Sequence, residues 1–99
     1  MPRIAASVDA NQAEIVAALR KAGCVVHLLH AVGKGTPDLL CGYKGKTYLI
    51  EVKNPDVPRM DQQLTPAEIT WHETWRGGDL AIIKTVEEAL AFVGALMDY

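Results

Sequence analysis

Two carboxylates and one lysine in this sequence have the residue types and spacing for phosphodiester hydrolysis. Asp38 follows Pro37, and Glu51 stands two residues before Lys53. Two carboxylates held close together repel each other, and a hard divalent cation such as Mg²⁺ or Mn²⁺ offsets that repulsion while it keeps waters and binds phosphate oxygens. The cation lowers the pKa of a bound water, and a neighbouring ammonium orients that water or neutralises charge on the phosphate. We therefore predict a metal-dependent hydrolytic site, with Asp38 and Glu51 as ligands and Lys53 in the chemical step.

The segment between Asp38 and Glu51 is expected to bring the two residues together. Residues 39–50 consist of a short apolar run, a turn rich in glycine and lysine, and a second run that favours β-structure. This pattern predicts a β-hairpin. A hairpin places its two ends side by side, and strand side chains on one face recur at every second residue. Asp38 should therefore lie beside Glu51, with Lys53 on the same face as Glu51.

The same residues resemble the signature of the PD-(D/E)XK nucleases, and their surroundings resemble the VRR-NUC family within that group. The similarity covers residues 11–93 and rests on four stretches, which are GTPDLL at 35–40, IEVK at 50–53, LTPAE at 64–68 and WH at 71–72. The small VRR-NUC nucleases occur in phages and bacteria and are related to the archaeal Holliday-junction resolvases.

This resemblance implies a DNA endonuclease that uses Mg²⁺ or Mn²⁺, with branched DNA or Holliday junctions as candidate substrates. It implies that the backbone carbonyl of Val52 joins Asp38 and Glu51 at the metal. It also implies a homodimer, since small members of the family are dimers, and in the family an N-terminal helix supplies a further glutamate to the metal site.

An N-terminal helix of this chain offers a matching acid. The helix is predicted to begin at Asp9 or Asn11 and to end near Gly23. Its apolar face is formed by Ile15, Val16, Leu19 and Ala22. Glu14 lies at the edge of this face, so that it could point into a cleft beside the sheet or complete a capping box with Asn11. The resemblance favours the first alternative, in which Glu14 takes part in metal binding and catalysis.

A first strand is expected at residues 24–30. His27 and His30 are three residues apart and would face opposite sides of that strand, so neither is assigned as a metal ligand. Cys24 and Cys41 lie in apolar, strand-like runs and are interpreted as buried free thiols, not as a disulfide.

The helix after the hairpin begins with a strong capping signal. Thr65 and Glu68 form a capping box around a proline at the first helical position, and the helix is expected to end near Arg76. The presence of glutamate at position 68 is therefore explained structurally by helix capping. Relatives in the resembled family carry a glutamine in this region, so Gln62, Gln63 or Glu68 could also support the metal site.

The last two elements complete the predicted fold. A strand is expected at residues 80–84, followed by a helix from Thr85 whose apolar stripe reaches Met97. The order αβββαβα predicts an α/β protein with one domain over residues 1–99. The resemblance implies a restriction-endonuclease-like αβββαβα core, in which a mixed central sheet is flanked by helices.

Charge is distributed unevenly along the chain. The net charge is −2, yet residues 20–53 hold six lysines and arginines against two acids, whereas residues 61–99 hold seven acids against two bases. The basic part carries the candidate site, as expected of a surface that contacts a phosphate backbone. The residues assigned to DNA contact are Lys34, Lys44, Lys46 and Gln63.

The remaining expectations concern partners and location. No apolar stretch approaches the roughly 20 residues that span a bilayer, and no signal-peptide pattern is present. We therefore expect no membrane contact and a cytoplasmic location, in the bacterial host cell if a phage encodes the protein. The alternative function is a non-catalytic DNA-binding or assembly module on the same fold. A metabolic α/β enzyme is disfavoured because no cofactor fingerprint or His/Cys cluster occurs.

A homodimer would double the basic surface and provide two sites for paired cuts. The chain also has apolar side chains that one small core would not fully cover, which favours association without identifying the interface. These are Ala91, Phe92 and Ala95 of the last helix, with Trp71 and Trp75. The alternative is that these side chains fill the core of a monomer.

Overall fold

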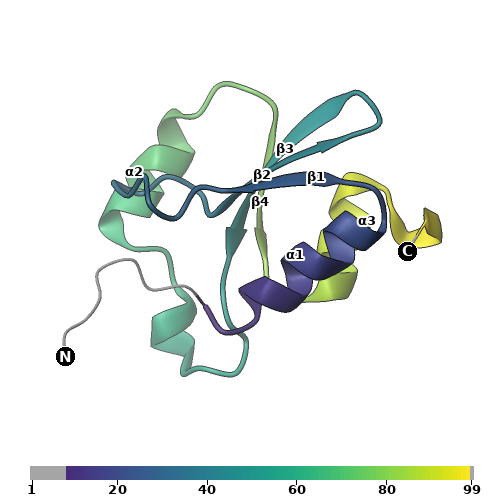
Figure 1. Cartoon of the computed structure of the whole chain (residues 1–99). Coiled ribbons are helices and arrows are strands. Elements are labelled where there is room, and N and C mark those ends of the chain that lie inside the picture. Colours follow the sequence, from purple (N-terminus) through teal and green to yellow (C-terminus); the bar gives the residue numbers. More distant parts are fainter. Residues whose placement is uncertain (1–8, 99) are drawn as a thin grey trace.

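The computed structural model describes residues 9–98, in which helices flank a mixed four-stranded sheet (Figure 1). The elements in chain order are α1 (Gln12–Lys21), β1 (Val25–Leu28), β2 (Leu39–Tyr43), β3 (Lys46–Val52), α2 (Pro66–Thr74), β4 (Asp79–Ile83) and α3 (Val86–Val93), with short 3₁₀ turns at Arg59–Gln62 and Leu96–Asp98. The predicted α/β class, the αβββαβα order and the mixed sheet are confirmed.

The strands are ordered β1-β2-β3-β4, so that β3 is a central strand. The pairs β1–β2 and β2–β3 are antiparallel, whereas β3 and β4 are parallel. A parallel pair needs a crossover, and here the connection from β3 to β4 contains α2. Figure 1 shows α1 and α3 together on one side of the sheet and α2 on the other.

The predicted hairpin is formed by β2 and β3. Its turn residues Lys44 and Gly45 have φ angles of 49° and 81°. Two consecutive positive φ values are typical of the tight turns whose twist matches that of paired strands. The register pairs Leu39 with Ile50, which brings the chain at Asp38 beside Glu51.

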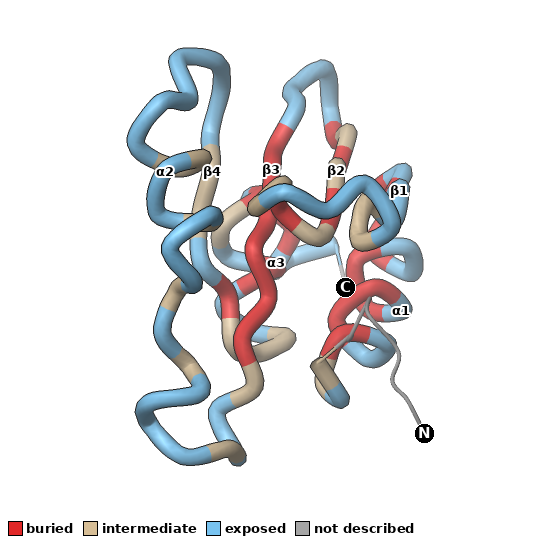
Figure 2. The backbone as a smooth tube through the Cα atoms, turned by 90° about the vertical axis from the view of Figure 1, so that its left-hand side faces the viewer, coloured by how far each residue is buried: buried red, intermediate tan, exposed pale blue. Residues whose placement is uncertain are grey.

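The two faces of β3 have different partners. Tyr48, Ile50 and Val52 belong to the hydrophobic core together with side chains of α1 and α3. Their neighbours on the other face, including Glu51 and Lys53, are also buried, which is why β3 is buried over most of its length in Figure 2. This second face is the one that α2 covers.

At the start of α1, the capping box that was the alternative role of Asn11 and Glu14 is absent. The Asn11 side chain makes no capping hydrogen bond. Its Nδ2 donates instead to the carbonyl oxygens of Lys53 (3.1 Å) and Lys84 (2.8 Å), just beyond the ends of β3 and β4. The helix is therefore fixed to the sheet by contacts that are remote in sequence, and Glu14 lies exposed on it.

Strand β1 is shorter than expected and ends at Leu28. The Leu29 N–H still donates to the Asp38 carbonyl opposite it (2.7 Å), and the chain then turns, because the Val32 N–H donates to the Leu29 carbonyl (2.9 Å). Cys24 and Cys41 are buried free thiols, as predicted.

The capping box of α2 is present. Thr65 Oγ1 accepts from the Glu68 N–H (3.2 Å), and Glu68 Oε1 accepts from the Thr65 N–H (2.8 Å). The helix ends at Thr74, slightly before the expected Arg76. None of its residues is buried.

Helix α3 is shorter than its apolar pattern predicted. It ends at Val93 because Gly94 adopts a left-handed conformation (φ 77°), a common way to terminate a helix. Leu96 and Met97 consequently do not extend the apolar stripe: they lie in a separate 3₁₀ turn and are 53% and 96% exposed. In the part of the chain that the structure describes, no helix is both long enough and apolar enough to cross a membrane.

Candidate active site

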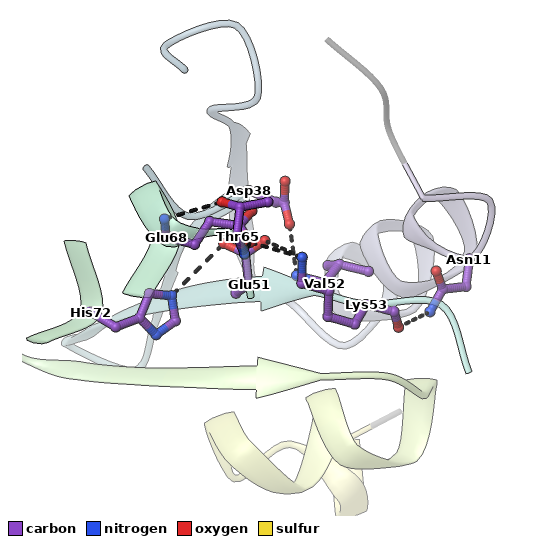
Figure 3. A network of polar contacts seen from close by, with 8 residues as sticks. All are labelled: Asn11, Asp38, Glu51, Val52, Lys53, Thr65, Glu68 and His72. Carbon is purple, nitrogen blue, oxygen red and sulfur yellow. Dashed lines mark hydrogen bonds and ion pairs between the residues drawn. The ribbon is translucent and has the colours of Figure 1, made fainter. Parts of the chain in front are cut away.

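Asp38 and Glu51 meet at the open end of the β2–β3 hairpin, as the spacing predicted. Asp38 Oδ2 accepts a hydrogen bond from the Val52 N–H at 2.7 Å (Figure 3). This bond fixes the Asp38 carboxylate against the backbone next to Glu51. The side chain of Val52 lies in the core, and the metal-binding role of its carbonyl oxygen stays a prediction.

Glu51 is a buried acid without adequate compensation. Its side chain is 2% exposed, and its Oε1 atom has no hydrogen-bond partner. Burial, followed by the negative charges of Asp38 and Glu68, raises the pKa of Glu51 to about 9. Burying a carboxyl oxygen without a hydrogen-bond partner is costly, so this position is poorly suited to a purely structural role.

Lys53 projects from the same face of β3 as Glu51. Its Nζ atom lies 2.9 Å from Glu68 Oε1 and 3.8 Å from Glu51 Oε2. Burial alone would lower the pKa of Lys53, but the hydrogen bond and charge of Glu68, with the charge of Glu51, outweigh it and raise the pKa. Lys53 is therefore a protonated ammonium at neutral pH.

His72 of α2 was quoted in the sequence motif without a role, and it lies beside Glu51. Its Nε2 atom is 3.9 Å from Glu51 Oε1 (Figure 3). Burial lowers the pKa of His72, which keeps the imidazole neutral at neutral pH. Both Nε2 and Glu51 Oε1 are buried, and neither has a hydrogen-bond partner.

A hollow of about 370 Å³ lies in front of Asp38, Glu51 and Lys53, and His72 is not part of its lining. The lining residues are Asp9, His30, Gly33, Gly35, Thr36, Asp38, Glu51, Lys53, Thr65 and Glu68. One wall is the loop between β1 and β2, which packs closely on the start of α2. A Cβ at Gly35 (φ 82°) would lie 2.3 Å from the Ala67 carbonyl oxygen, so this contact requires glycine. The lining contains four acids and one lysine, an excess of negative charge that favours a cation.

The donor set fits a hard divalent cation that keeps much of its water shell. Asp38 and Glu51 supply adjacent carboxylates, and Mg²⁺ commonly binds one or two carboxylates together with waters and phosphate oxygens. Among residues 9–98, no group of three or more His, Cys, Asp or Glu side chains could hold a metal ion. A cation here would thus depend on two protein carboxylates, water and substrate.

Glu14 does not lie with Asp38 and Glu51, contrary to the expected placement. It lines a different hollow, together with Asn11, Pro55, Asp56 and Lys84 among other residues. The hydrogen bonds of Asn11 set the direction of α1 and leave Glu14 on its exposed side.

Asp9 is the N-terminal acid that lines the hollow instead. Burial raises the pKa of Asp9, the charge of Lys53 lowers it, and Asp38 and Glu68 raise it further. The sequence identified Asp9 only as a possible helix cap. The one feature of the sequence that pointed to Asp9 as a site residue was its position just before the start of α1.

The residues assigned to DNA contact are not grouped as expected. Lys34 is exposed between Gly33 and Gly35, which line the hollow. Lys44 and Lys46 lie at the hairpin turn, and the five-residue step from Lys46 to Glu51 corresponds to roughly 17 Å along a strand. They pair with Asp98 (3.0 Å) and Asp79 (4.0 Å).

Two glutamines of the connecting loop had been considered as support for the metal site. Gln62 Nε2 donates to the carbonyl oxygens of Pro55 (3.2 Å) and Val57 (2.9 Å), and so it holds its own loop together. Gln63 is exposed. Glu68 was the third residue considered as support for the metal site, and it is the one with a hydrogen bond to a site residue, Lys53.

Comparisons of this chain with models of known protein families, with curated proteins and with solved structures found no match. The resemblance to the VRR-NUC nucleases stays a prediction that rests on the motif residues.

Proposed function

We propose that this protein is a metal-dependent DNA endonuclease of the VRR-NUC type, with Mg²⁺ or Mn²⁺ as cofactor and a restriction-endonuclease-like arrangement of its α/β fold. The observation that carries the proposal is the state of Glu51: a 2% exposed carboxyl with an unpartnered oxygen, beside Asp38 and on the same strand face as Lys53. A buried carboxyl that serves only the fold is normally hydrogen-bonded through both oxygens, whereas a metal ligand keeps an oxygen for the metal.

Each side chain has a distinct part in the proposed reaction. Asp38 and Glu51 would hold the cation, which supplies charge neutralisation and a water of lowered pKa when bound. The Asp38–Val52 hydrogen bond orients one ligand. Lys53 presents an ammonium to the hollow, where it can orient the attacking water or stabilise negative charge that develops on the phosphate.

The substrate is proposed to be the DNA backbone, approached through the open hollow. Lys34 is exposed and its chain neighbours Gly33 and Gly35 line the hollow, which makes it the best candidate among the assigned DNA contacts. Lys44 and Lys46 would contact only DNA that extends to the far end of the hairpin. Branched DNA and Holliday junctions stay candidate substrates, and a cytoplasmic location in a bacterial cell belongs to the same proposal.

The proposal includes a homodimer, whose interface the sequence did not identify. Ala95 is fully buried and Phe92 packs edge-on against Tyr48. These two side chains therefore leave little exposed apolar surface near the last helix for a dimer interface. Val25 and Leu28 on the edge strand β1 are 63% and 47% exposed and support an interface there. Light scattering at micromolar concentration tests this: a mass near 10.8 kDa contradicts the dimer, and twice that mass supports it.

The function itself is tested by incubating purified protein with end-labelled branched, nicked and linear duplex DNA, with and without Mg²⁺. We expect internal cuts only with the metal, and most rapidly on the preferred DNA structure. Binding without cleavage at any metal concentration would favour the non-catalytic module.

A further inference from the structure

Helix α2 is held over the site by polar contacts. None of its residues is buried, and Ile69 is 43% exposed. Trp71 stacks on Trp75, just past the end of the same helix, with ring centroids 5.0 Å apart. Since apolar burial is the usual means of fixing a helix on a sheet, α2 depends to an unusual degree on its polar contacts.

One oxygen of Glu68 makes two polar contacts. Glu68 Oε1 accepts from the Thr65 N–H at 2.8 Å and from Lys53 Nζ at 2.9 Å. The first bond caps α2, and the second joins the helix to β3. Capping alone explains why position 68 is glutamate or glutamine, but it does not explain the bond to Lys53.

The direction of the Lys53 ammonium is set by this bond. Lys53 is 7% exposed, so water competes little for its charge. The other acid in reach is Glu51, whose Oε2 lies 3.8 Å away, beyond hydrogen-bond distance. Without Glu68, no carboxylate oxygen of the described residues would lie within hydrogen-bond distance of the Lys53 ammonium, which could then turn away from its present direction.

We propose that Glu68 is a positioning residue, which holds the Lys53 ammonium at the hollow. This inference rests on the proposed function for its catalytic consequence. One N–H of the Lys53 ammonium is thereby held by Glu68, and two further N–H groups remain for water or phosphate.

The first test needs no enzymatic activity. Native protein is treated with formaldehyde and a mild borohydride, and the methylation rate of each lysine is measured by peptide mass spectrometry. We expect Lys53 to react much more slowly than the exposed Lys34. Glu68→Ala should accelerate Lys53 by about 10- to 100-fold, the effect of losing a hydrogen bond between charged groups, and leave Lys34 unchanged.

Two further variants separate positioning from capping. Glu68→Gln keeps an acceptor for the Thr65 N–H, so α2 stays capped while Lys53 loses its charged partner. It should show an intermediate Lys53 rate and a wild-type circular dichroism spectrum. Glu73→Ala, at an exposed acid of the same helix, should behave as wild type in both measurements.

The second test measures cleavage and DNA affinity of the same variants. Glu68→Ala should lower the single-turnover rate by about 10- to 100-fold, the size expected for a misplaced reacting group, with little change in Kd for DNA. An unchanged Lys53 methylation rate in folded Glu68→Ala would overturn the proposal. If wild-type protein cleaves no DNA, the proposed function fails, whereas the methylation rates still decide whether Glu68 holds Lys53.

Discussion

Asp38 and Glu51 approach each other at the open end of the hairpin, where burial and then the charge of Asp38 raise the pKa of Glu51 to about 9. In the unfolded chain this carboxyl would have its ordinary pKa of 4.5. Between these two values the folded protein holds a proton that the unfolded chain has released. The free energy of unfolding must therefore fall as pH rises through this window in the absence of metal.

The first prediction follows from this linkage. Glu51→Gln removes the titrating group, so the metal-free variant should be more stable than wild type at pH 8. We expect its Tm to rise by about 4 °C or more, the shift that 1 kcal/mol causes in a domain of this size. Thermal melts in EDTA at pH 5 and pH 8 measure it, with the exposed Glu87→Gln as control. An equal pH dependence in Glu51→Gln and wild type would show that Glu51 is not the group responsible.

The second prediction concerns the metal as a stabilising ligand. Mg²⁺ at 100 times its dissociation constant stabilises a protein that binds it only when folded by about 2.7 kcal/mol. Wild-type Tm at pH 8 should therefore rise with Mg²⁺, whereas Glu51→Gln and Asp38→Asn should respond weakly. If all three proteins respond alike, the ion binds elsewhere.

The hairpin and its two acids could be predicted because their geometry is local. The turn at Lys44 and Gly45 and the alternation along β3 fix the positions of Asp38, Glu51 and Lys53 without reference to the rest of the chain. The same geometry also implies that the turn lies far from the open end of the hairpin. Because Lys44 lies in that turn, the sequence alone could have shown that Lys44 is far from the site.

The position of α1 could not be predicted in the same way. It depends on Asn11, whose hydrogen-bond partners are 42 and 73 residues away in sequence. The helical pattern identified which residues of α1 face the core, but not where its start lies relative to the site. Glu14 was therefore expected in the site and Asp9 was not.

The third prediction compares these two acids. Asp9→Asn should reduce metal-dependent cleavage by about 10-fold, the lower end of the effect of losing a group near metal ligands. Glu14→Gln should leave cleavage within about twofold of wild type, because Glu14 lines another hollow. Cleavage rates over a series of Mg²⁺ concentrations compare the two variants. If Glu14→Gln lost more cleavage activity than Asp9→Asn, the N-terminal acid of the site would be Glu14 and not Asp9.

The fourth prediction concerns Lys53. Lys53→Ala should lower the single-turnover rate far more than it weakens DNA binding, because its ammonium acts mainly on charge that develops in the transition state. Lys34→Ala, in the loop that forms one wall of the hollow, should do the opposite and weaken binding with a smaller effect on the rate. Fluorescence anisotropy with uncleaved DNA in Ca²⁺ measures affinity, and quenched-flow cleavage measures the rate. A Lys53 variant that binds weakly yet cleaves at the normal rate would reduce Lys53 to a phosphate contact.

The most direct measurement of the central claim is the Mg²⁺-dependent cleavage rate of Asp38→Asn on a substrate that wild-type protein cuts. The matched control is Asp61→Asn, since Asp61 is exposed in the loop after β3. We predict that Asp38→Asn is folded by circular dichroism and at least about 100-fold slower than wild type, whereas Asp61→Asn is unchanged. Equal rates for Asp38→Asn and wild type, with protein purified free of other nucleases, would contradict a metal-dependent nuclease site at Asp38 and Glu51.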